Sequence, residues 1–185
     1  MNRKLIILAV FLLFIIIGFG GIYNGIISKN ENVKTKWAQV ESQLRRRGDL
    51  IGNLVNSVRG YATHENTLLE DITKARSQWQ DAGSIEDKIK GSAQVDTMLS
   101  RLMVVVENYP NLKANEPFLK LMDELAGTEN RIAVERMRYN EAVRDYNIIV
   151  RRFPSNLIAR MFGYEEAAAY IEAGRVERAA PVVKF

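Results

Sequence analysis

The chain contains no cysteine, a single histidine and four prolines among its 185 residues, and each scarcity excludes something. Without cysteine, no thiol is available as a nucleophile, metal ligand or lipidation site, although the redox compartment stays undetermined. The histidine, His64, precedes Glu65 but has no second histidine at helical spacing, which excludes a zinc-hydrolase helix of the H-E-x-x-H type. The scarcity of proline is typical of a chain that forms long helices.

The amino-terminal stretch is the most apolar part of the chain. Every residue from Leu5 to Ile22 is apolar or glycine, and Arg3 and Lys4 are the charged side chains before it. At a helical rise of ~1.5 Å per residue, residues 5–27 reach ~34 Å, enough for the ~30 Å hydrocarbon core of a bilayer. We therefore predict a transmembrane helix over residues 5–27, behind a short basic tail of residues 1–4.

A cleaved secretory signal is the alternative for this stretch. Arg3 and Lys4 followed by residues 5–17 would also serve as a basic region and an apolar core of a signal peptide. The apolar run continues through residues 18–22, however, with no Ala-x-Ala-like site behind it. This pattern favours an uncleaved single-pass anchor.

Positive charge is concentrated just after the anchor. The candidate contacts to anionic lipid headgroups are Lys29, Lys34, Lys36, Arg45, Arg46 and Arg47. A solvated helix face is the alternative for these residues, whereas nucleic acid is not expected as a partner, because no basic stripe with interleaved aromatics follows. The charge count on the two sides of the anchor favours a cytoplasmic bundle, although a short basic head also permits translocation of the long domain.

The remaining chain is predicted to be helical, because apolar residues recur at spacings of three and four. A first long segment extends the anchor, and its continuity between Gly48 and Thr63 is left open. A second helix begins at the capping residue Ser84 and ends before Pro110. A third, of ~35 residues, is capped by Asn115 and ends at Pro154.

Aromatic residues of the third helix fall at steps of seven, which is typical of coiled-coil-like packing: Tyr139, Tyr146 and Phe153. We expect the ring of Phe153 to plug the end of the bundle. The predicted fold is all-α, with the transmembrane helix followed by an antiparallel up-and-down bundle of three to four long helices. This bundle occupies residues 28–174, and an apolar carboxyl-terminal tail occupies residues 175–185.

Several motifs resemble the LemA family, in order and with its spacing. They are Tyr23-Asn24 and residues 43–55, 60–65, 73–76, 107–115, 129–132, 138–147 and 153–156. The chain departs from the family pattern at Gly52, where proline is usual, and in a shortened carboxyl end. The resemblance implies a single-pass protein of the bacterial inner membrane with a helical up-and-down bundle. The family's biochemical activity is not established, so the resemblance does not settle function.

A polar stripe accompanies the aromatic seam of the third helix: Glu129, Arg136, Asn140 and Asn147, with Asp49 and Asn53 as possible partners. It is either a recognition face or a network joining the bundle's own helices. The acidic residues of this helix alternate with arginines, which indicates surface pairing and not a metal site. His64 is interpreted as a helix-end residue, with a pH sensor as the alternative.

These patterns predict a protein that binds and does not catalyse, with no cofactor, metal or catalytic residue. The favoured hypothesis is a scaffold at the membrane that assembles with copies of itself. Its expected partners are the lipid bilayer, a second copy of the chain, and another membrane or envelope protein. The alternative is a membrane-tethered adaptor or sensor, which docks a partner protein through the distal bundle end and residues 175–185.

Overall fold

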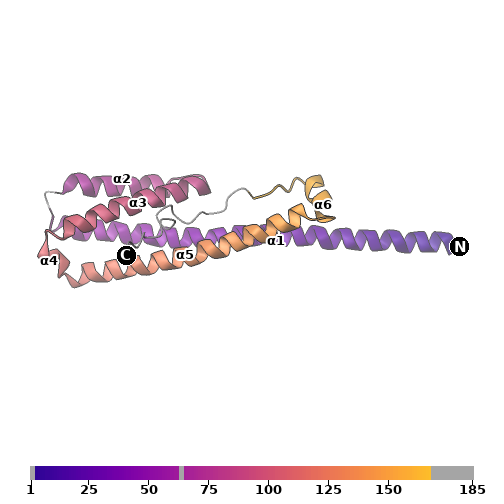
Figure 1. The fold of residues 1–185 in the computed structure, drawn as a ribbon, viewed down its shortest axis with the longest axis horizontal. Coiled ribbons are helices and arrows are strands. Elements are labelled where there is room, and N and C mark those ends of the chain that lie inside the picture. The colour runs from indigo at the N-terminus through magenta and orange to yellow at the C-terminus, as the bar shows by residue number, and fades with distance from the viewer. Residues whose placement is uncertain (1–2, 63–64, 168–185) are drawn as a thin grey trace, which may run out of the picture. The chain divides into compact units, whose positions relative to one another are not determined.

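A computed structural model of the chain describes residues 3–62 and 65–167, and in these ranges it forms helices and no strands. The helices are α1 (Arg3–Arg59), α2 (Asn66–Gln80), α3 (Ile85–Val106), α4 (Pro110–Lys113), α5 (Glu116–Arg151) and α6 (Ser155–Met161) (Figure 1). The predicted all-α class, with one long apolar helix at the amino terminus, is confirmed.

The helix ends follow local sequence signals. The hydroxyl of Ser84 accepts a hydrogen bond from the Asp87 amide at 3.0 Å, and the Asn115 side chain accepts one from the Phe118 amide at 3.0 Å. Both bonds satisfy donors that the first turn of a helix leaves free. At the other end of α5, the helix stops at Arg151, shortly before Pro154.

Helix α1 answers the question of continuity that the sequence left open. It runs without interruption through Gly48 and Gly52 and ends at Arg59, just before Gly60. A side chain at Gly48 would place its Cβ 2.8 Å from the Gln80 amide nitrogen. That atom is the far end of a flexible side chain, and the glycine does not break the helix.

The chain divides into two compact units, both of which contain parts of α1 and α5. Unit 1 contains α1 up to Ala38, α5 from Met137 onward, and α6. Unit 2 contains residues 39–136, and so the rest of α1 and α5 together with α2, α3 and α4. The bundle range predicted from the sequence covers parts of both.

Unit 2 has a mainly aliphatic core. Helices α2 and α3 run antiparallel and are joined by the short turn at residues 81–84 (Figure 1). Buried residues recur every three or four positions on each helix, as amphipathic packing requires. Those no more than 2 % exposed include Val40, Ile51, Leu54, Val58, Leu69, Ile72, Val95, Leu102, Leu112, Phe118 and Ile132.

Unit 1 has two buried tyrosines in its core. The ring of Tyr139 packs against Trp37 at a centroid distance of 5.6 Å and an interplanar angle of 64°, an edge-to-face contact. Tyr146 lies in a cluster of buried residues with Ile26, Val150, Ile158 and Ala159. Two of the three aromatic residues predicted for the seam are therefore buried.

Phe153 differs from this prediction. Its side chain is 78 % exposed and does not plug the end of a bundle. Helix α5 ends at Arg151, so the seven-residue phase that buries Tyr139 and Tyr146 does not extend to position 153.

Candidate functional site

The first turns of α1 expose a continuous apolar surface. Twelve large apolar side chains between Leu5 and Ile17 are each at least 43 % exposed, and Phe14 reaches 74 %. Among the helices that the structure describes, α1 has the length and composition needed to cross a membrane. Its own backbone hydrogen bonds satisfy the peptide groups, as a hydrocarbon environment demands.

The basic residues after this surface have different environments. The Lys29 ammonium lies 3.0 Å from Asp145, and this bond lowers the pKa of the Asp145 carboxyl. Lys34 pairs with Glu31 at 2.7 Å, and Arg46 lies 3.8 Å from Glu124. All three pairs are open to solvent, so they leave the cations accessible to other anions.

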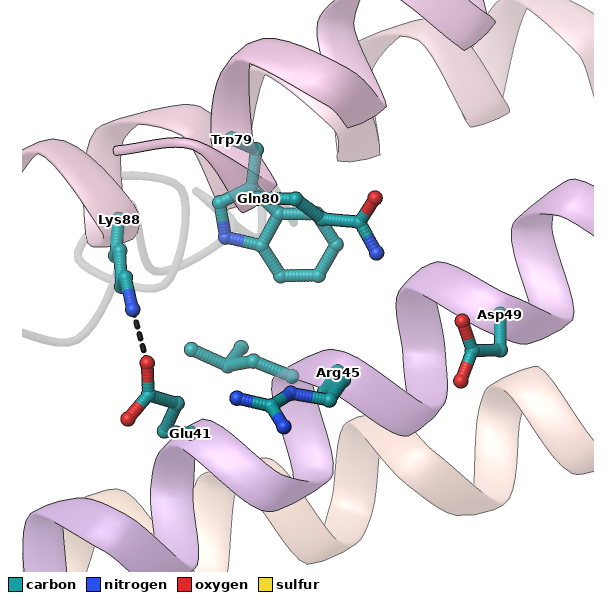
Figure 2. Close-up of a pocket in the computed structure, with 7 residues that line it drawn as sticks. Glu41, Arg45, Asp49, Trp79, Gln80 and Lys88 are labelled. Atoms are coloured by element: carbon teal, nitrogen blue, oxygen red, sulfur yellow. Dashed lines mark hydrogen bonds and ion pairs between the residues drawn. The ribbon is translucent and has the colours of Figure 1, made fainter. Parts of the chain in front are cut away.

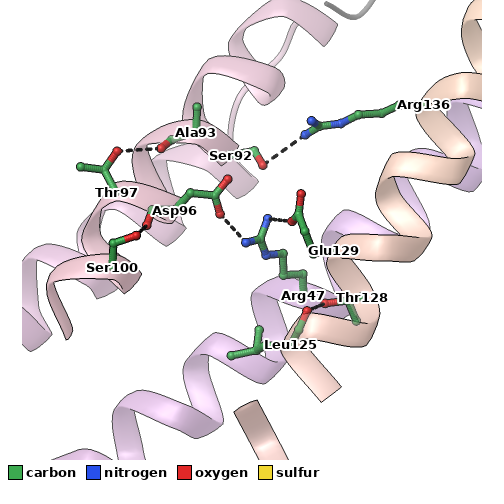
Figure 3. A network of polar contacts seen from close by, with 10 residues as sticks. All are labelled: Arg47, Ser92, Ala93, Asp96, Thr97, Ser100, Leu125, Thr128, Glu129 and Arg136. Carbon is green, nitrogen blue, oxygen red and sulfur yellow. Dashed lines mark hydrogen bonds and ion pairs between the residues drawn. The ribbon is translucent and has the colours of Figure 1, made fainter. Parts of the chain in front are cut away.

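Arg47 departs from the predicted set of headgroup contacts, because its side chain is only 8 % exposed. Its guanidinium bonds to Asp96 of α3 and lies 2.6 Å from Glu129 of α5 (Figure 3). A guanidinium paired inside unit 2 cannot also reach a lipid phosphate. We therefore exclude Arg47 from the proposed headgroup contacts, while Lys29, Lys34, Lys36, Arg45 and Arg46 stay in the set.

The arrangement around Arg47 places two carboxylates on one buried cation. Burial raises the pKa of the Asp96 carboxyl, Arg47 opposes that shift, and the nearby Glu129 reinforces it. The Arg47 Nε atom is buried and has no hydrogen-bond partner in the described part of the chain. Nearby, Arg136 donates to the Ser92 hydroxyl at 3.4 Å, which adds a second link between α5 and α3. The group links three helices that are distant in sequence.

The predicted polar stripe is distributed over both units. Glu129 and Arg136 belong to unit 2, whereas the partly buried Asn140 and the buried Asn147 belong to unit 1. The Asn147 amide donates to the Ala167 carbonyl at 3.2 Å and accepts from the Ala167 amide at 2.9 Å. It thus holds the segment after α6 against α5.

The two residues proposed as partners of this stripe lie at the surface of unit 2. Asp49 is 3.6 Å from Arg76, and Asn53 is exposed. Arg47 is the partner that sequence reasoning missed. Its position three residues after Leu44 and four before Ile51 places it on the apolar face of α1, and this spacing was the available signal.

A groove of about 270 Å³ lies between α1, α2 and α3 (Figure 2). Trp79 contributes its ring, and Lys88 forms an ion pair with Glu41 across the opening. The other lining residues are Leu44, Arg45, Asp49 and Gln80. The lining combines charges of both signs with the apolar side chains of Leu44 and Trp79.

Over residues 3–62 and 65–167, no three histidine or acidic side chains gather where they could hold a metal ion. His64 and the tail at residues 175–185 lie outside the described residues, so the interpretations given for them remain predictions.

Comparison with known proteins gives a family match over most of the chain. The family model described as LemA family matches residues 36–185. Two Paramagnetospirillum magneticum proteins, magnetosome proteins MamQ 1 and MamQ 2, are each 28 % identical over 81 % of this chain. The chain spans 65 % of their length. Protein LemA of Metamycoplasma hominis is 24 % identical over 91 % of this chain and 80 % of its own length.

Proposed function

We propose, from the premise that this chain belongs to the LemA family, that it is a membrane-anchored helical protein that acts by binding, without a reaction of its own. In this proposal it is a single-pass protein of the bacterial inner membrane. It assembles with copies of itself or with another envelope protein. The names of the matched relatives denote no reaction, which supports a role other than catalysis.

The apolar surface of α1 is the observation that carries the proposal. Burying one large apolar side chain away from water stabilises a protein by about 1.5–3 kcal/mol. The exposed side chains between Leu5 and Ile17 should therefore be buried in an apolar environment. A bilayer covers all sides of such a helix at once. Because α1 continues without a break from this segment to Arg59, the anchor belongs to the same helix as residues packed in both units.

Glycines near the end of the apolar segment support self-assembly. A Cβ atom built at Gly18, Gly20 or Gly21 meets no atom within 4 Å. Small residues let helices approach closely in a bilayer, where packing and not hydrophobicity drives association. We propose that this part of α1 contacts α1 of a second copy.

Chemical crosslinking in native membranes tests self-assembly. The unmodified chain should give dimers or larger species, and Gly20→Leu should reduce their yield several-fold by blocking close approach. Ile17→Leu is the matched control, because it leaves the volume of an already large side chain unchanged. Recovery of monomers alone from the unmodified chain would contradict the scaffold proposal.

The side of the membrane needs a separate experiment. The charge count predicts a cytoplasmic bundle, so a reporter fused after Phe185 that is active only in the cytoplasm should be active. Activity of an export-dependent reporter at the same position would reverse the proposed orientation. Recovery of a soluble product that begins after residue 21 would contradict the anchor itself.

A further inference from the structure

We propose that α6 and the turn before it form a second membrane contact, which lies in the interfacial layer of the bilayer beside the anchor; this inference rests on the proposed anchoring. The evidence is confined to unit 1. It consists of an apolar face on α6 without any cover in the described structure, its position along α1, and the arginines around it.

Helix α6 is apolar on two opposite faces. Its inward face contains Ser155, Ile158 and Ala159, which are buried in unit 1. Successive helical residues turn by about 100°, so positions 157 and 161 lie on the opposite face. These side chains are Leu157, 59 % exposed, and Met161, 64 % exposed, and the 78 % exposed Phe153 lies in the turn before the helix. Packing within unit 1 explains the first face but not the second.

The position of α6 along α1 brings this second face to the edge of the proposed transmembrane segment. The Phe162 ring, directly after α6, lies 6.0 Å from the Phe19 ring and 4.6 Å from the Tyr23 ring. Ile158 and Ala159 share a core cluster with Ile26. Residues 19–26 form the last turns of the predicted 5–27 span, where aromatic side chains favour the headgroup level. In this proposal the apolar face of α6 is buried in the bilayer and not against another part of the protein.

Charge around α6 favours an anionic lipid surface as the occupant. Arg152 and Arg160 are exposed next to Phe153 and Met161, and interfacial helices combine basic and apolar side chains in this way. A groove of about 330 Å³ adjoins the turn, lined by Gly18, Gly21, Ile22, Gly25, Ile149, Arg152, Pro154 and Ser155. A basic residue beside an apolar groove suits a phosphate headgroup with its acyl chain.

Site-directed spin labelling of the full chain in phosphatidylcholine vesicles with phosphatidylglycerol tests this inference. The chain lacks cysteine, so single labels are placed through Leu157→Cys and Met161→Cys. Leu13→Cys in the apolar segment and Glu141→Cys on the exposed part of α5 are the reference positions. For each label we compare its collision rate with apolar oxygen to its collision rate with a polar nickel chelate. This ratio should be several-fold higher at 157 and 161 than at 141.

The reference positions separate failure of this inference from failure of the proposed function. Labels at 157 and 161 that behave like the label at 141, with position 13 in lipid, would overturn the interfacial contact and leave the anchor intact. A label at position 13 that is accessible to the nickel chelate would overturn the proposed anchoring. Low collision with both reagents at 157 and 161 would indicate cover by a second copy of the chain, and would also overturn this inference.

Discussion

The two units are stabilised differently, although parts of the same two helices contribute to both. Unit 2 combines a mainly aliphatic core with an arginine that is almost completely buried and paired to two carboxylates. Unit 1 combines aromatic residues with the solvent-exposed pair of Lys29 and Asp145. The two sites should therefore contribute unequally to stability, because removing Arg47 leaves two like charges beside a buried position, whereas removing Lys29 leaves a single exposed carboxylate.

Removing the cation from each unit tests this contrast and should give the largest effect. Arg47→Met leaves Asp96 and Glu129 close together without their counter-charge. Both are partly solvated, so we expect the free energy of unfolding to fall by about 2–3 kcal/mol, below the full value for a buried pair. Lys29→Met should change it much less, because water replaces the lost partner.

Urea unfolding of the full chain in detergent micelles measures both variants. Trp79 belongs to unit 2 and Trp37 to unit 1, so their fluorescence, read in Trp37→Phe and Trp79→Phe backgrounds, reports the units separately. Equal losses from Arg47→Met and Lys29→Met would show that burial does not distinguish the two pairs.

Two glycines of unit 2 differ in their surroundings: Gly91 is tightly packed, whereas Gly127 is open. A Cβ at Gly91 of α3 would lie 3.1 Å from the Trp79 Cα atom, whereas a Cβ at Gly127 of α5 meets nothing within 4 Å. Gly127→Ala should raise the free energy of unfolding by about 0.5–1 kcal/mol through helix propensity. Gly91→Ala should lower it by about 1 kcal/mol, because overpacking outweighs that gain. The same urea experiment checks both signs, and stabilisation by Gly91→Ala would contradict the packing described.

The pKa values of two carboxyls are shifted in opposite directions, and we expect their effect on stability to be the smallest of those predicted here. The pKa of Asp145 is lowered, so its stabilising contribution is present above the unfolded pKa of about 3.9 and is lost as pH falls through the folded value. The pKa of Asp96 is raised, so its contribution is complete below about 3.9 and is lost as pH rises through its folded value. Carboxyl carbon NMR titration measures both, and an Asp96 midpoint below that of Asp145 would contradict this order.

Local signals in the sequence predicted the class and several helix ends. Ser84 and Asn115 cap their helices, and α5 ends shortly before Pro154, because these effects need only neighbouring residues. The apolar amino-terminal helix could also be predicted, since its length and composition are enough to identify it. The continuity of α1 could not be predicted, because Gly48 and Gly52 both lower helix propensity and only the packing of the helix decides whether it bends there.

The candidate site was predicted only in part, because long-range packing decides it. Arg46 and Arg47 are adjacent and chemically identical, yet Arg47 is buried against α3 and α5, whereas Arg46 stays exposed beside Glu124. The polar stripe on α5 was predicted as one group, but Glu129 and Asn147 find partners in different units. Phe153 was misjudged because a heptad pattern carries no information about where the helix stops.

The environment of Arg47 also constrains the order of folding. Asp96 follows Arg47 by 49 residues, and Glu129 is synthesised later still. Until both have emerged from the ribosome, desolvating the guanidinium would be strongly unfavourable, and the nascent α1 must keep this side chain hydrated. Completion of unit 2 therefore waits for the synthesis of α5, and an early hairpin of α2 and α3 cannot close the core on its own.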